Sequence, residues 1–265
     1  MFEGNGRTDP GGRAETIYQL LRAWAQDTPE AIALAAPGHA AITYERLLNQ
    51  IDAVAKSLRE VGIDHDHRIV MVLPNGIELA AMFLGVSCSA ISVPLNPACQ
   101  ENEIESYLSG LGAKAVLVQS TARSPAVAVA QRHRIPVIEL ISTQSGGSSL
   151  LTLKASAAVS SARQHQLEPD DVALILHTSG TTSKPKRVPL THRNLYASAH
   201  AVRDTLRLTS ADRCLGVMPL FHIHGLVGGL LSSLAAGSSF AAIVNADPRY
   251  FFDSMKVFKP TWYTA

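Results

Sequence analysis

The residues best suited to chemistry in this sequence occupy positions 178–186, which read TSGTTSKPK. This stretch combines hydroxyl side chains, one glycine and two lysines between two apolar segments. A polyphosphate needs this mixture, because hydroxyl and backbone N–H groups donate to its oxygens, a glycine lets the backbone approach closely, and an ammonium offsets its charge. The composition predicts a loop that binds a phosphorylated anion. A solvated Ser/Thr-rich turn is the alternative that composition alone leaves open.

The charges around this loop have one sign. No Asp or Glu occurs from Val172 to Arg203, whereas the same stretch holds five cationic residues: Lys184, Lys186, Arg187, Arg193 and Arg203. The whole chain has Lys+Arg 23 and Asp+Glu 22, a net charge of +1, so no overall field attracts nucleic acid or an anionic membrane. The local excess of cations indicates a small anionic ligand, and no nucleic-acid partner is expected.

Two common nucleotide-binding patterns do not describe this loop. A P-loop reads GxxxxGK[ST] and runs into a helix, whereas Gly180 is followed six residues later by Lys186 and then by a segment typical of a strand. No GxGxxG follows the first predicted strand, which disfavours an NAD(P)-dependent Rossmann enzyme. The phosphate contacts are therefore expected from a different kind of loop.

Strand and helix signals alternate along most of the chain. Before residue 142, helices are predicted at 43–62, 77–88, 102–108 and 126–132 and strands at 69–73, 91–95, 115–119 and 136–141. After residue 170, strands are predicted at 172–177, 187–190, 215–218, 239–244 and 261–265 and helices from Thr191, over 223–236 and over 248–258. The hydrophobic fraction of 46% and charged fraction of 17% fit a core rich in buried sheet. The alternation predicts an α/β fold with parallel sheets and helices on their faces.

Composition divides the chain into three parts. Residues 142–170 are rich in Ser, Gly, Ala and Gln, which is typical of a flexible connection. We therefore expect a first α/β subdomain over 1–141, a linker over 142–170, and a second α/β subdomain over 171–265 that carries the phosphate loop. The last predicted strand has no covering helix after it, so we expect the fold to continue beyond this sequence.

The cysteines and the hydropathy of the chain indicate in which cellular compartment the protein is expected. The three cysteines, at positions 88, 99 and 214, are far apart and lack a CxxC spacing, so free thiols in a reducing compartment are predicted. The N-terminus lacks the apolar core of a signal peptide, which makes the cytoplasm the expected location. The uncharged run 223–244 is long enough to cross a bilayer, but its glycines and serines favour a buried helix followed by a buried strand.

Two sequence motifs resemble motifs of one enzyme family and occur in the same order as in that family. Leu176 to Asn194 (LHTSGTTSKPKRVPLTHRN) resembles the phosphate-binding signature of adenylate-forming enzymes, which include acyl-CoA synthetases, aryl-CoA ligases, luciferases and peptide-synthetase adenylation domains. Met218 to Gly225 (MPLFHIHG) is similar to the segment that this family places beside its acyl-substrate pocket. Weaker likenesses lie at 42–47 and 72–76, so the resemblance covers almost the whole chain and implies the N-terminal part of such an enzyme.

This resemblance implies a reaction and its participants. A small carboxylic acid attacks the α-phosphate of MgATP to give an acyl-adenylate and pyrophosphate, and a thiol then displaces AMP to give a thioester. ATP, Mg²⁺ and the thiol of CoA or phosphopantetheine are the implied cofactors. An adenylation module that loads an acyl-carrier protein shares these motifs and stays open, as does a non-catalytic remnant that only binds nucleotide.

The motifs also imply roles for individual residues. The expected nucleotide-binding residues are Thr178, Ser179, Gly180, Thr181, Thr182, Ser183 and Lys186. Lys186 and His222 are the expected catalytic residues, with His222 between the substrate carboxylate and the thiol tunnel. Phe221, His222 and Gly225 are expected to line the acyl pocket. Thr191 is expected to cap the next helix, and His177 to be structural.

The sequence departs from the commonest family form at two loop positions. Ser183 replaces a glycine and resembles a branch that includes oxalate-activating and related enzymes. Arg187 replaces another glycine, so either the loop edge tolerates it or nucleotide affinity is altered. The family elements that hold adenine, ribose and Mg²⁺, and a late lysine, are implied to lie beyond Ala265. No metal ligand is therefore assigned, and the chain alone is expected to form no acyl-adenylate.

Overall fold

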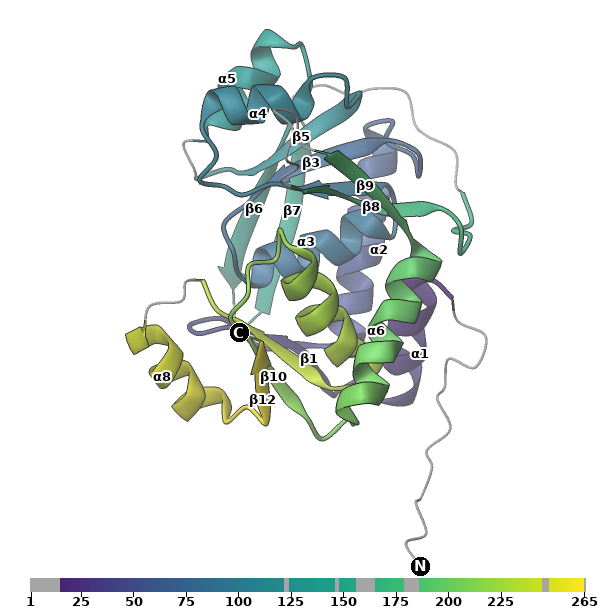
Figure 1. The fold of residues 1–265 in the computed structure, drawn as a ribbon, viewed down its shortest axis with the longest axis vertical. Coiled ribbons are helices and arrows are strands. Elements are labelled where there is room, and N and C mark those ends of the chain that lie inside the picture. Colours follow the sequence, from purple (N-terminus) through teal and green to yellow (C-terminus); the bar gives the residue numbers. More distant parts are fainter. Residues whose placement is uncertain are drawn as a thin grey trace, which may run out of the picture.

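Two β-sheets, one of seven strands and one of five, form the frame of the protein (Figure 1). The computed structural model describes residues 15–121, 124–145, 148–155, 165–178, 186–244 and 248–264. The larger of the buried apolar clusters joins side chains of both sheets, such as Met71 and Phe240, with those of the helices between them. The main core therefore lies between the sheets.

The seven-stranded sheet has the order β7-β6-β5-β3-β4-β8-β9. Its strands are β3 (Arg68–Val72), β4 (Ile91–Pro94), β5 (Ala113–Gln119), β6 (Val137–Ser145), β7 (Ser148–Ala155), β8 (Val172–Thr178) and β9 (Lys186–Thr191). The strands from β6 to β8 are parallel, and the edge strands β7 and β9 are antiparallel to their neighbours. The predicted α/β fold is confirmed. The expected parallel strands are present in this sheet, and the edge strands β7 and β9 are antiparallel because a short connection between consecutive strands can only join antiparallel neighbours.

The five-stranded sheet has the order β12-β10-β11-β1-β2. Its strands are β1 (Ile32–Ala35), β2 (Ile42–Thr43), β10 (Arg213–Gly216), β11 (Ser239–Ala242) and β12 (Trp262–Thr264). Sequence patterns did not predict β1 and β2, because runs of four and two residues are too short to show alternation.

Helices cover both faces of the seven-stranded sheet (Figure 1). The described helices are α1 (Ile17–Asp27), α2 (Tyr44–Glu60), α3 (Ile77–Ser87), α4 (Glu101–Leu108), α5 (Pro125–Arg132), α6 (His192–Leu206), η1 (His224–Leu231), α7 (Ser232–Ala235) and α8 (Pro248–Phe258). α4 and α5 pack on one face with Val70 and Val116, and α2 and α3 pack on the other with Ile69 and Met71. α3 is buried on all sides, which explains its uniformly apolar sequence.

Local capping signals in the sequence are confirmed. The Thr43 side chain accepts a hydrogen bond from the Arg46 N–H (3.3 Å) and caps α2. The Thr191 side chain accepts one from the Asn194 N–H (3.2 Å) and caps α6. Gly62 follows the end of α2 with a φ of 73°, a conformation that glycine adopts without strain.

The helix predicted over 223–236 is confirmed, but most of its length is not α-helical. Residues His224–Leu231 form the π-helix η1, and only Ser232–Ala235 are α-helical. The Ser232 and Ser233 hydroxyls donate to the carbonyls of Gly228 (2.6 Å) and Gly229 (2.7 Å). These bonds satisfy carbonyls inside the helix, which apolar periodicity does not reveal. No helix among the described residues is both long and apolar enough to span a membrane.

Each sheet contains strands from both of the subdomains that composition predicted. β8 and β9 complete the seven-stranded sheet, and β1 and β2 complete the five-stranded one. β7 lies in the stretch predicted as a linker and pairs with β6. Pairing alone does not define which parts fold independently, so the division at residues 142–170 stays a prediction.

Candidate active site

The predicted phosphate loop connects the two strands of a hairpin. β8 ends at Thr178 and β9 begins at Lys186, and these two residues are register partners across the hairpin. Ser179, Gly180, Thr181, Thr182 and Ser183 lie outside the described residues. The described residues therefore place Thr178 and Lys186, both exposed, side by side where the loop leaves the sheet. We call this pair the hairpin mouth.

The hairpin mouth lies at the edge of the sheet where ligands are expected. β8 is parallel to β4, and β4 to β3, so the carboxyl ends of these strands share one edge. In open α/β sheets, ligands bind outside the carboxyl ends of the strands. The hydroxyl of Thr178 and the ammonium of Lys186 suit phosphate oxygens rather than a divalent cation. We assign no Mg²⁺ ligand to this pair.

Asn75 joins the second motif to the same edge. Its side chain accepts a hydrogen bond from the Leu220 N–H (2.9 Å) and donates one to the Ile243 carbonyl (2.8 Å). Asn75 lies three residues after the carboxyl end of β3, whereas Leu220 lies in the second motif and Ile243 follows β11. One side chain thus connects the two sheets and positions the segment 218–225. The sequence marked position 75 only as part of a weak likeness and missed this role.

The second motif forms a turn that leads into η1. The His222 N–H donates to the Pro219 carbonyl (3.2 Å), and the Leu226 N–H donates to the His222 carbonyl (3.0 Å). The His222 side chain is exposed and its ring lies 4.7 Å from that of half-buried Phe221. The structure thus brings Phe221 and His222 together, and their roles toward substrate stay predictions.

Gly225 has a structural reason to lack a side chain. A Cβ built on Gly225 would lie 2.3 Å from the Pro219 carbonyl oxygen and 2.7 Å from that of Met218. Any other residue would force η1 away from the turn, because these neighbours are backbone atoms. Gly225 is buried, so its contribution to an acyl pocket stays a prediction.

A pocket of about 700 Å³ lies beside the second motif. Its lining residues are Val202, Leu206, Leu208, Asp212, His224, Gly228, Thr261, Trp262, Tyr263 and Thr264. It is bordered by α6, η1 and β12, and it includes His224 rather than the three residues that were predicted to line the acyl pocket.

Fewer positive charges are available to the loop than the five cationic residues of the sequence suggest. Arg187 donates to the carbonyls of Gly110 (2.8 Å) and Ser109 just after α4. Arg193 pairs with Asp170 (2.9 Å) and Arg203 with Asp204 (2.8 Å). Lys184 lies outside the described residues.

Lys186 therefore lies at the hairpin mouth, whereas Arg187, Arg193 and Arg203 bind other groups. Arg187 stabilises the end of α4, because a cation near a helix C-terminus interacts favourably with its exposed carbonyls. Its effect on nucleotide affinity stays a prediction.

His177 lies just before the hairpin mouth and is held neutral. Burial, assisted by the positive charge of Arg187, lowers the pKa of His177 to about 4. Its ring lies 4.7 Å from that of Tyr107 on α4. The uncharged imidazole packs between α4 and the hairpin, which agrees with the structural role expected for it.

Comparison with known proteins decides the family. The profile of the AMP-binding enzymes matches residues 21–265, almost the whole chain. This chain belongs to the AMP-binding enzyme family. The resemblance to adenylate-forming enzymes is thereby confirmed, and nucleotide binding at the hairpin mouth stays a prediction.

Relatives within the AMP-binding enzymes are CoA ligases. The chain is 38% identical over 259 residues to an oxalate–CoA ligase of Arabidopsis thaliana, covering 95% of this chain and 50% of the relative. It is 36% identical over 259 residues to a probable CoA ligase of Humulus lupulus, covering 94% and 49%. The chain spans about half the length of these curated relatives.

A solved AMP-binding enzyme shares the fold. O-succinylbenzoate CoA synthetase of Bacillus subtilis, in complex with AMP, superposes with a TM-score of 0.76 at 24% identity, covering 93% of this chain and 61% of that chain. This likeness confirms the architecture expected for the N-terminal domain of an adenylate-forming enzyme.

Proposed function

We propose that this chain contributes the phosphate-binding part of a carboxylate:CoA ligase of the AMP-binding family. In the first step a carboxylate oxygen bonds to the α-phosphorus of ATP and pyrophosphate leaves. In the second step the CoA sulfur bonds to the acyl carbon, its proton is lost, and AMP leaves. The observation that carries the proposal is the hairpin mouth at the carboxyl edge of the sheet, within a chain of this family.

Lys186 and Thr178 would act on charge in the first step. An anion must approach a nucleotide that itself carries several negative charges, so the barrier is lowered by donors held in place before reaction. The Lys186 ammonium would offset charge on the phosphates, and Thr178 would donate a hydrogen bond at the other side of the mouth. Mg²⁺ would offset further phosphate charge when bound.

The acid is proposed to be a small one, and CoA the acceptor. The relative with 38% identity is an oxalate–CoA ligase, and Ser183 agrees with that branch. His222, exposed on the turn held by Asn75, would contact the acyl carboxylate or the incoming thiol. A carrier protein as acceptor is the second candidate, and a cytoplasmic location stays a prediction.

Nucleotide binding tests the hairpin mouth directly. We expect the 265-residue chain to bind a fluorescent ATP analogue, and Lys186→Ala to weaken binding at least about tenfold, because a hydrogen bond to a charged group contributes about 1.5–3 kcal/mol. Lys56→Ala is the control, since Lys56 is exposed on α2. Equal affinity in the Lys186 and Lys56 variants would overturn the assignment.

Carboxylate-dependent exchange between ATP and pyrophosphate tests the chemistry. We expect no exchange from the 265-residue chain, because further nucleotide-binding elements of the family are implied outside it. In a longer protein that contains this chain we expect oxalate to support exchange and CoA to convert the adenylate to a thioester. Exchange without thioester formation from CoA would favour a carrier protein as acceptor.

A further inference from the structure

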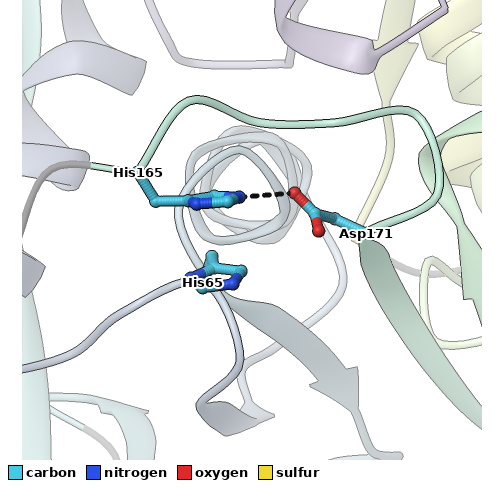
Figure 2. A group of neighbouring side chains, drawn as sticks. All are labelled: His65, His165 and Asp171. Carbon is cyan, nitrogen blue, oxygen red and sulfur yellow. Dashed lines mark hydrogen bonds and ion pairs between the residues drawn. The ribbon is translucent and has the colours of Figure 1, made fainter.

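A cluster of two histidines and an aspartate lies outside the candidate active site. His65 belongs to the turn between α2 and β3, whereas His165 and Asp171 belong to the segment that enters β8 (Figure 2). One potential ligand atom from each of the three side chains lies within 4.8 Å of the other two. The two imidazole rings are stacked with their centroids 3.6 Å apart. Residues 100 positions apart in the sequence thus meet in one place.

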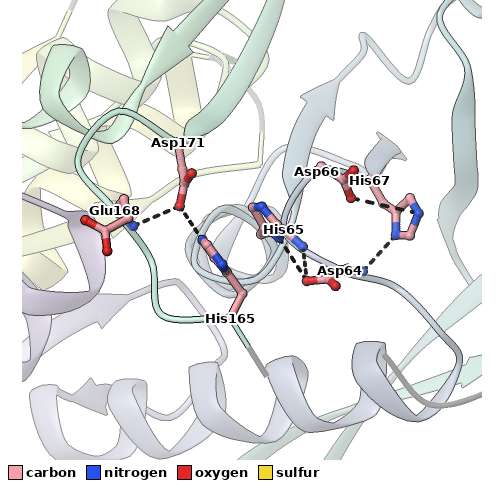
Figure 3. Close-up of polar contacts among 7 residues, drawn as sticks. All are labelled: Asp64, His65, Asp66, His67, His165, Glu168 and Asp171. Atoms are coloured by element: carbon pink, nitrogen blue, oxygen red, sulfur yellow. Dashed lines mark hydrogen bonds and ion pairs between the residues drawn. The ribbon is translucent and has the colours of Figure 1, made fainter. Parts of the chain in front are cut away.

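Hydrogen bonds hold each histidine against a carboxylate (Figure 3). His165 Nε2 lies 2.8 Å from Asp171 Oδ2, and the same oxygen accepts a bond from the Glu168 N–H (2.8 Å). His65 Nδ1 lies 3.0 Å from Asp64 Oδ1, which also accepts from the His65 N–H (2.7 Å). With Nδ1–H donating to Asp64, the Nε2 lone pair of His65 is available to a metal ion. Asp64 thus orients His65 as carboxylates orient histidine ligands in metalloproteins, whereas the bond between His165 and Asp171 is replaced when both bind the ion.

We propose that His65, His165 and Asp171 bind a borderline divalent transition-metal ion of the Zn²⁺ class. Imidazole and carboxylate ligands suit Zn²⁺, Ni²⁺ and Co²⁺, whereas Mg²⁺ prefers oxygen ligands alone. Bonds of about 2.0–2.2 Å in a tetrahedral site require ligand atoms about 3.3 Å apart, so the side chains move inward on binding. One stacked ring also turns about its Cβ–Cγ bond, because two nearly parallel rings cannot both point their lone pairs at one ion. Water completes the coordination, since both histidines are partly exposed.

The location of the cluster suits a structural ion rather than a catalytic one. β3 begins at Arg68 and β8 at Val172, so the cluster lies at the amino edge of the parallel strands, opposite the hairpin mouth. The seven residues of β8 separate the two edges by about 20 Å at about 3.3 Å per residue. The ion would fasten the segment 165–171 to the turn 64–67 and so fix the start of the strand that leads to the phosphate loop.

Zn²⁺ titration of the chelator-treated, tag-free chain, with calorimetric detection, tests the proposal. We expect one ion per chain, and binding weakened by more than about 100-fold in His65→Gln and in His165→Gln, because each removes a ligand whereas loss of an orienting partner alone costs about 10–100-fold. Asp64→Asn is expected to weaken binding less than either, because Asp64 only orients His65. Excess Mg²⁺ should not displace Zn²⁺, and Zn²⁺ should raise the Tm of the parent chain but not of the His65→Gln/His165→Gln double variant.

His133→Gln is the matched control. His133 is another exposed histidine paired with a carboxylate, Glu105, but Arg132 rather than a second imidazole accompanies it. Its Zn²⁺ affinity should equal that of the parent chain. Binding that is not one-to-one, or that survives in both cluster variants, would overturn the proposal. Metal-free melting curves show whether the variants fold, and the titration uses no nucleotide, so its outcome leaves the ligase proposal untouched.

Discussion

Several side chains in this protein contact residues that are far away in the sequence. Asn75 holds the second motif, Arg187 holds the end of α4, and His65 meets His165. The sequence presented Arg187 as one of five cations near the loop and as a departure from the family pattern. In the structure the Arg187 guanidinium donates to the carbonyls of Gly110 and Ser109, which lie 77 and 78 positions earlier in the chain.

Buried His192 makes stability depend on pH. Burial lowers the pKa of His192 to about 4, against an ordinary value of 6.5, with Asp171 opposing the shift. The unfolded chain thus binds more protons between pH 6.5 and pH 4, so this contribution is complete above pH 6.5 and is lost as the pH falls toward 4. At pH 5 the loss is about 2 kcal/mol. Urea unfolding at pH 7.5 and 5.0 measures it, and His192→Asn should reduce the difference; an equal difference would contradict this attribution.

Substitution of Asn75 tests the connection between the sheets. Asn75→Ala removes both hydrogen bonds and leaves the Leu220 N–H and the Ile243 carbonyl without their partner. We expect a loss of about 1–3 kcal/mol in the free energy of unfolding. Asn75→Asp retains the acceptor for Leu220 and should restore hydrogen-exchange protection of that amide, but not the bond to Ile243. If the Leu220 amide exchanges equally fast in both variants, Asn75 does not position the motif.

At the scale of elements, the π-helix η1 is the feature that periodicity describes least well. Its uniform apolar sequence fits burial, but nothing in it distinguishes an i→i+5 ladder from an α-helix. The sequence predicted a buried helix there because the run is uncharged while its glycines and serines disfavour a membrane span. The Pro219 carbonyl lies against Gly225 at the start of this ladder, and the Ser232 hydroxyl donates to the Gly228 carbonyl near its end.

Two glycine substitutions separate backbone constraint from side-chain crowding in η1. Gly225→Ala places a methyl 2.3 Å from a backbone oxygen, whereas Gly228→Ala meets the His224 ring at 2.9 Å. The His224 side chain is exposed and can turn away. We therefore expect Gly225→Ala to lower the free energy of unfolding by more than about 2 kcal/mol, and Gly228→Ala to cost clearly less. Denaturant midpoints measure both, and equal costs would contradict the close approach.

At the scale of the whole molecule, contacts between distant segments tie the two sheets together. The Tyr44 hydroxyl donates to the Ser238 carbonyl (2.8 Å), and Trp24 packs where a side chain at Gly237 would lie. The largest core cluster includes residues of α1, α2, α3, β11 and η1. A core shared in this way favours a single cooperative unit.

Cooperative unfolding tests whether the division at residues 142–170 marks independent subdomains. We expect the Trp fluorescence and far-UV circular dichroism of the 265-residue chain to change in one coincident transition in urea. Tyr44→Phe should shift that transition to lower urea without splitting it, because the hydroxyl bond joins α2 to the residue before β11. Two separate transitions would instead support subdomains that fold on their own.

The sequence by itself determined the family, the α/β class and the helix caps, and it predicts the place of a phosphate loop. Each rests on neighbours within the chain: a cap spans three residues, and the signature motif is continuous. Only the tertiary structure decided which strands share a sheet, that Asn75 reaches Leu220, and that His65 meets Asp171. The physical reason is that these contacts form where distant segments return to one another, and the spacing of residues along the chain does not encode which distant backbone atom a side chain will reach.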